Sequence, residues 1–177
     1  MINEPKKIDK PDEGEFEPYT SMYINLLPDD GMILSHLRNN FEELKNLISS
    51  LSEEKLLYRY EVDKWTIKEI LVHLIDDERI YCYRALRYAR GDKTELPGFE
   101  QDDFAANSFA NERSIEGILE EYRTVRESTI SLFSNFDEST YKRSGIGSGN
   151  IMSVRAAVYH IAGHELHHLN FVKEYYL

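Results

Sequence analysis

The stretch His160-Ile-Ala-Gly-His164-Glu-Leu-His167-His168 carries four of the six histidines of the chain. Apolar residues around it recur at the helical period, so we predict a helix that begins after Ser153. On a helix, residues four positions apart lie about 40° apart around the axis and about 6 Å apart along it. His164 and His168 therefore face the core together and can reach one metal ion, whereas His167 points about 100° away from His168.

A second stretch supplies a third imidazole. Thr66-Ile-Lys-Glu69 is a capping box, which predicts a helix that runs to about Arg90 and stops at Gly91. His73 borders the apolar stripe of this helix. Each histidine alone is explained as a core residue with hydrogen bonds, but adjacent buried imidazoles are costly unless their nitrogens are satisfied. A metal ion satisfies them, so we predict a three-histidine site with an open position, as catalytic metals have.

Two further helices complete the fold. One follows Pro28-Asp-Asp-Gly31 and another begins near Ser114, both with apolar stripes at the helical period. The sequence therefore predicts an all-α four-helix bundle over residues 28–177, with a long crossover between the second and third helices. Residues 1–27 are expected to form an extended arm, and residues 144–150 a flexible turn; no strand is predicted. The crossover, which begins at Gly91, is expected to fold over one end of the bundle with Leu96, Phe99 and Phe104 as apolar anchors.

Composition narrows the class of partner. The 177 residues contain 21 Lys and Arg against 32 Asp and Glu, a net charge of −11 that disfavours nucleic acid and anionic lipid. The first residues have no apolar signal core, no long apolar run spans a membrane, and the single cysteine, Cys82, cannot form an internal disulfide. We expect a cytoplasmic protein. Cys82 lies about opposite His73 on its helix and is interpreted as structural.

Several motifs together resemble one family. They include Leu96-Pro-Gly-Phe-Glu-Gln and Ala162-Gly-His-Glu-Leu-His-His-Leu, with His73 upstream. Over nearly its whole length the chain is similar to the DinB/YfiT-like superfamily of metal-binding bundles, in its DinB-like subgroup. The resemblance implies an up-down-down-up order of helices and metal ligation by His73, His164 and His168. It leaves His160 and His167 outside the ligand set. Some relatives transfer low-molecular-weight thiols, and others look like metal-dependent hydrolases or isomerases.

Other polar residues are candidates for catalysis. Asp77 lies four positions after His73 and is expected to orient the ring of His73; the alternative is a solvated or structural carboxylate. Glu165 is a candidate general base, and its alternative is pairing with an arginine. Arg84 and Tyr81 either bind an anionic group of the substrate or bridge helices, and we favour the second. The roles of His160 and His167 stay open.

We therefore expect a metal-dependent enzyme acting on a small molecule. Three neutral imidazoles leave a divalent ion a strong Lewis acid, which activates water for hydrolysis or a thiol for transfer. Zinc or nickel is expected first, with iron or manganese as alternatives. A homodimer is also expected. The competing hypothesis is a non-enzymatic metal-binding stress-response protein that dimerises through its helices. An open polar pocket at the metal would favour the enzyme, and a closed site the competing hypothesis.

Overall fold

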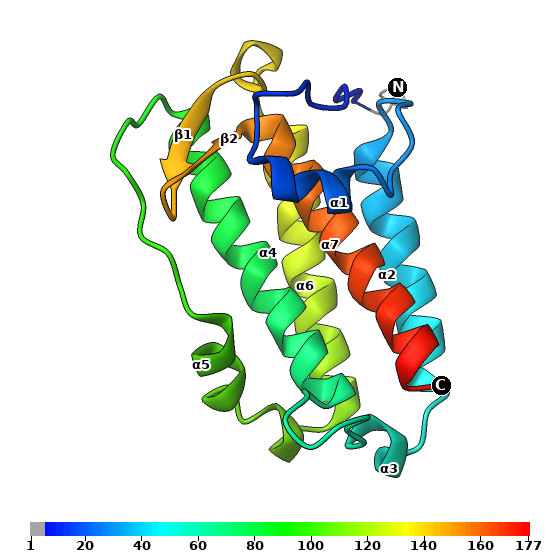
Figure 1. Cartoon of the computed structure of the whole chain (residues 1–177). Helices are drawn as coiled ribbons and strands as arrows, with labels where there is room; N and C mark the ends of the chain where they lie inside the picture. The colour runs from blue at the N-terminus through cyan, green and yellow to red at the C-terminus, as the bar shows by residue number, and fades with distance from the viewer. Residues whose placement is uncertain (1–5) are drawn as a thin grey trace.

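Four long helices dominate the computed structural model, which describes residues 6–177 (Figure 1). They are α2 (Ile33–Ser49), α4 (Ile67–Ala89), α6 (Ile115–Ser134) and α7 (Val154–Tyr175). Helices α2 and α7 run in one direction, and α4 and α6 run in the other (Figure 1). This confirms the predicted four-helix bundle and the up-down-down-up order that the resemblance implied.

The bundle helices begin and end where local signals predict. The Thr66 hydroxyl accepts from the Glu69 backbone at 3.1 Å, and the Glu69 carboxylate accepts from the Thr66 backbone at 2.7 Å. This capping box opens α4, and Gly91 follows its end with φ +79°, a conformation that favours glycine. The hydroxyls of Ser114 and Ser153 cap α6 and α7 in the same manner.

The crossover between α4 and α6 lies along the side of the bundle. It contains α5 (Gln101–Ala106) and a 3₁₀ turn, Ala110–Glu112. Because α4 and α6 are parallel, the chain must return along the length of α4 before α6 can begin (Figure 1). The expectation that it folds over one end is therefore wrong. Leu96 does anchor it, buried at 4% exposure, whereas Phe104 remains 45% exposed.

A β-hairpin replaces the flexible turn expected at residues 144–150. Strands β1 (Ser144–Gly147) and β2 (Asn150–Ser153) pair antiparallel, so the prediction of no strand is wrong. Ser148 and Gly149 form the two-residue connection with φ of 55° and 76°, which matches the hairpin turns that require positive φ. Bridges to Phe16 and Leu96 hold the hairpin, and these distant partners are not visible in a local pattern.

The described part of the arm, residues 6–27, packs on the bundle. It contains a 3₁₀ turn, Pro18–Thr20, and the short helix α1 (Ser21–Ile24), which lies across α7 (Figure 1). Ile8, Ile24 and Leu27 are buried. A side chain at Gly163 of α7 would collide with the carbonyl oxygen of Tyr23, so this glycine permits the close crossing.

The apolar stripes of the four long helices form the core between them. Residues such as Leu37, Tyr122 and Phe133 are at most 1% exposed. Two short elements connect the ends of the bundle, α3 (Glu53–Leu56) and a 3₁₀ turn, Glu138–Thr140. Within residues 6–177, no helix combines the length and the hydropathy that crossing a membrane requires.

Candidate metal centre

Three imidazoles from α4 and α7 converge between these two helices. His73 Nε2 lies 3.3 Å from His164 Nε2, which in turn lies 3.0 Å from His168 Nε2. Nitrogen ligands of a tetrahedral zinc ion, at their usual bond length, stand roughly 3.3 Å apart. The spacing of the three Nε2 atoms thus fits a single divalent ion. The structure brings together all three predicted ligands.

Burial favours the neutral form of two of the three candidate ligands, His73 and His168. It lowers the pKa of His73 from 6.5 to about 4, with a further contribution from His164. Burial and the same neighbour hold the pKa of His168 well below its ordinary value. A metal ligand must be the neutral imidazole, so the surroundings of both rings favour the form that binds metal.

Asp77 contacts the third candidate ligand, His164, and orients its ring. Its Oδ2 atom lies 3.2 Å from His164 Nδ1, the ring nitrogen that does not face His73 and His168. Burial raises the pKa of Asp77, but His164 and His160 more than offset it, so the pKa lies below its ordinary value. The carboxylate therefore holds the proton of His164 on Nδ1 and leaves Nε2 free as a ligand. Asp77 thus contacts His164 from the facing helix, and the expectation that it orients His73, its neighbour on α4, is wrong.

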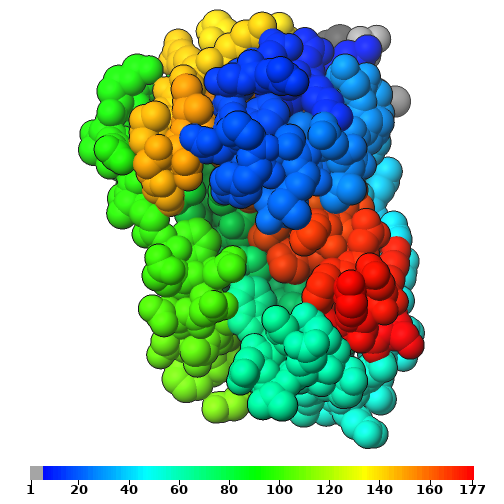
Figure 2. Space-filling view, in the orientation of Figure 1, coloured from blue at the N-terminus to red at the C-terminus, as the bar shows by residue number. Residues whose placement is uncertain are grey.

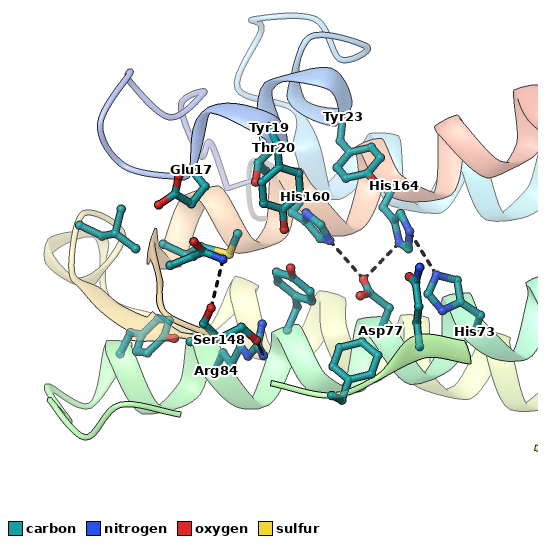
Figure 3. Close-up of a pocket in the computed structure, with 18 of the residues that line it drawn as sticks. Glu17, Tyr19, Thr20, Tyr23, His73, Asp77, Arg84, Ser148, His160 and His164 are labelled. Carbon is teal, nitrogen blue, oxygen red and sulfur yellow. Dashed lines mark hydrogen bonds and ion pairs between the residues drawn. The ribbon is translucent and has the colours of Figure 1, made fainter. Parts of the chain in front are cut away.

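Aromatic rings hold the histidines in place. Trp65 packs on His73 with ring centroids 4.8 Å apart, and Tyr23 packs edge-on against His164 at 5.1 Å. Tyr23 comes from α1, so the arm forms part of the wall of the site (Figure 3). Packing of this kind restricts the rotation of the ligand rings, which a precise metal geometry requires.

The two remaining histidines of α7 take different positions. His160 is buried, stacks on Tyr81 with ring centroids 3.8 Å apart, and places Nε2 3.3 Å from Asp77. It thus forms a second cluster with Asp77 and His164, next to the three-histidine cluster. His167 is half-buried against Tyr23 and belongs to neither cluster.

Glu165 points into the bundle core instead of the site. It is fully buried and accepts from Tyr122 at 2.9 Å and from Arg126 at 3.0 Å. Arg126 also binds Glu78 at 2.9 Å. The arginine pairing considered as the alternative is therefore what the structure contains, and the geometry gives no support to a general base at this position.

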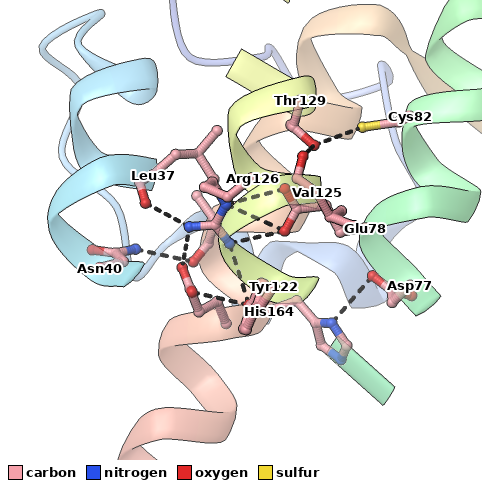
Figure 4. A network of polar contacts seen from close by, with 12 residues as sticks. Leu37, Asn40, Asp77, Glu78, Cys82, Tyr122, Val125, Arg126, Thr129 and His164 are labelled. Carbon is pink, nitrogen blue, oxygen red and sulfur yellow. Dashed lines mark hydrogen bonds and ion pairs between the residues drawn. The ribbon is translucent and has the colours of Figure 1, made fainter. Parts of the chain in front are cut away.

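Cys82 also lies away from the histidines. Its sulfur contacts Thr129 Oγ1 at 3.2 Å (Figure 4). Burial raises the pKa of the thiol to about 12, so it stays protonated and unreactive at neutral pH. This agrees with the structural role predicted for it.

A polar cavity of about 400 Å³ opens beside the cluster (Figure 3). His73, Asp77 and His164 line one end, and Arg84 and Ser148 line the other. Figure 2 shows this face of the molecule hollowed, with α4 visible between the crossover on one side and the arm and α7 on the other. A second cavity of about 280 Å³, with aromatic walls, meets the cluster at His168 and Trp65.

The cavity contains Arg84 and Tyr81, for which the bridging of helices was favoured over anion binding, and other residues that were given no functional role. Tyr81, Arg84 and Tyr88 line it from α4, and Thr20 and Ser148 from the arm and the hairpin. Arg84 is eleven positions after His73, which places both on one helix face. That spacing was available in the sequence, whereas the contributions of the arm and the hairpin depend on long-range packing.

Comparisons with known proteins agree with this geometry. Residues 36–172 match the profile of the DinB superfamily. A curated protein of Oceanobacillus iheyensis, named "Putative metal-dependent hydrolase OB0413", is 28% identical over 142 residues, 79% of this chain and 81% of that protein. YfiT from Bacillus subtilis, described as a "probable metal-dependent hydrolase with an unusual four-helix bundle topology", superposes with a TM-score of 0.71 at 15% identity. The superposition covers 93% of this chain and 90% of YfiT.

Proposed function

Because the chain belongs to the DinB superfamily, we propose that it is a metal-dependent hydrolase of a small-molecule substrate. One observation carries the proposal: three imidazoles converge on one point, and two of them, those of His73 and His164, line an open, polar cavity. Such a site leaves a coordination position for a reactant, which a purely structural metal site does not. The cavity thus supports an enzyme over a non-enzymatic metal-binding protein that dimerises through its helices.

The chain's own residues bind the substrate and orient the imidazole rings. A divalent ion held here, with zinc or nickel favoured by the imidazole donors, would lower the pKa of a water or thiol ligand and polarise a substrate carbonyl. Asp77 keeps the His164 proton on Nδ1, and Trp65 and Tyr23 fix the rings. The cavity walls hold the substrate beside the three histidines.

Thiol transfer is a second candidate, favoured by the aromatic cavity at His168. Two cavities on different sides of one cluster leave room for two reactants, as transfer of a low-molecular-weight thiol to an electrophile requires. Cys82 is buried near Thr129 with a raised pKa, so the thiol would have to come from a substrate.

One experiment separates the candidates. Zinc- and nickel-loaded protein is incubated with a panel of activated esters, amides and lactones, and separately with monochlorobimane and low-molecular-weight thiols. We expect metal-dependent hydrolysis that is lost in His168→Ala and retained in His167→Ala. Conjugate formation without hydrolysis would identify a thiol transferase. No turnover in either assay, at full metal content, would favour the non-enzymatic alternative.

A further inference from the structure

Arg84 carries a buried positive charge at the end of the cavity away from the histidines. Its side chain is 6% exposed, and of the described residues that line the cavity it is the single arginine or lysine. Figure 3 shows it beside Ser148, with Asp77 between it and His73. Along α4, the backbone positions of His73 and Arg84 are separated by a rise of about 16 Å. Both side chains reach into the cavity, so their ends lie closer together than this.

No carboxylate neutralises this charge. Arg84 Nη2 donates to the Pro97 carbonyl at 3.1 Å and to Ser148 Oγ at 2.9 Å. Within residues 6–177, no Asp or Glu oxygen lies within 4.0 Å of the guanidinium. Because a buried and unpaired charge is unfavourable, residues of this kind usually have a counter-ion. The two existing hydrogen bonds fix the guanidinium plane and leave its remaining N–H groups for a ligand.

Two buried hydroxyls of residues that line the cavity also have no partner. Tyr88 Oη and Thr20 Oγ1 make no hydrogen bond, although both residues are 1% exposed and line the cavity. Gly147 lies against Tyr88 Oη. A Cβ atom at Gly147 would stand 2.9 Å from Tyr88 Oη and 3.0 Å from Arg84 Nε. Glycine at this position lets the hairpin backbone approach both groups without a clash. An unsatisfied hydroxyl beside a guanidinium with no counter-ion is an arrangement that an anion would satisfy.

We propose that Arg84 and Tyr88 Oη bind the carboxylate of an elongated small-molecule substrate whose other end meets the three histidines. The inference rests on the proposed function for the role of that second end. A guanidinium fork matches the two oxygens of a carboxylate. Glu17, Asp77 and Glu100 also line the cavity, so a singly charged anion meets less repulsion than a phosphate dianion.

Calorimetric titration of the zinc-loaded protein tests whether one ligand can reach from Arg84 to the three histidines. The probes are the dicarboxylates adipate, suberate and sebacate, each compared with its monomethyl ester. We expect one chain length to bind best and Arg84→Gln to weaken that dicarboxylate about tenfold or more, with a smaller loss for the ester. Arg84→Lys should restore little of the dicarboxylate affinity, because lysine lacks the two parallel N–H donors of a guanidinium. Arg38→Gln, at an exposed position with the same change of charge, should bind as the wild type.

A metal-free measurement separates this inference from the proposed function. In metal-free protein, acetate should shift the ¹⁵N resonance of Arg84 Nε more strongly than inorganic phosphate does, and Tyr88→Phe should reduce that shift. If the protein shows this shift but fails to bind zinc, the inferred carboxylate site stands and the proposed metal-dependent function is wrong. Equal dicarboxylate affinity in Arg84→Gln and wild type, at full zinc content, would overturn the inference, as would a preference for phosphate.

Discussion

His164 uses both of its ring nitrogens, and this double use connects the two polar clusters. Nε2 faces His73 and His168, while Nδ1 faces Asp77, which also contacts His160. The spacing of His164 and His168 made their shared helix face predictable from the sequence, and the resemblance added His73. The contact between Asp77 and His164 joins two helices and depends on how α4 and α7 pack. The sequence could indicate only that Asp77 lies near a ligand.

Asp77→Asn should keep the fold and weaken zinc binding about 10- to 100-fold, because an amide no longer stabilises the Nδ1 proton of His164. Competition titration against a zinc chelator gives the affinity. The matched control is Asp76→Asn, next in the chain, whose carboxylate lies 3.7 Å from Arg79 and outside both clusters. Equal affinity in the two variants would remove Asp77 from the site.

Acid should destabilise the metal-free protein through His73. Its pKa is about 4 in the folded protein against 6.5 ordinarily, so the unfolded chain binds the proton first as pH falls. The free energy of unfolding should therefore decrease between pH 7 and pH 4, with a contribution from His73 of about 2 kcal/mol by pH 5. Urea titrations of EDTA-treated protein across this range give the curve. His73→Asn should flatten it, and parallel curves would contradict the shifted pKa.

At the scale of elements, the sequence predicted the pieces with strong local signals. Capping residues and stripes at the helical period located the four long helices, as at Thr66 and Ser114. The hairpin is different, since its strands are short and glycine-rich and bridge to Phe16 and Leu96, which are distant in sequence. Two walls of the cavity, from the arm and the hairpin, were therefore beyond prediction from local patterns.

Gly163 of α7 tests whether the arm belongs to the site. Alanine usually stabilises a helix relative to glycine by about 1 kcal/mol, but here its Cβ would collide with the carbonyl oxygen of Tyr23. We expect Gly163→Ala to increase hydrogen exchange of amides 20–27 while those of the bundle core stay protected. Gly117→Ala is the control, since a Cβ there approaches only the hydroxyl of Ser114, at 3.1 Å. Unchanged exchange in Gly163→Ala would mean that the arm does not depend on this crossing.

At the scale of the whole molecule, the parallel pair α4 and α6 accounts for the shape of the site. The crossover must return along α4, and in doing so it covers one side of the cavity, while α1 and the hairpin cover others (Figures 1 and 3). The helix order followed from the resemblance and not from periodicity, because periodicity places residues on faces without fixing how the helices connect. The cavity is thus a property of the topology, whereas the ligands are a property of local spacing.

The ligand set is the central claim, and the zinc content of two adjacent alanine variants tests it most directly. Elemental analysis after zinc loading and dialysis should find one ion per chain in wild type and in His167→Ala, and far less in His168→Ala. Circular dichroism should show an intact bundle in all three, because alanine is the best helix former. Equal zinc in the two variants, or a greater loss in His167→Ala, would contradict the three-histidine site.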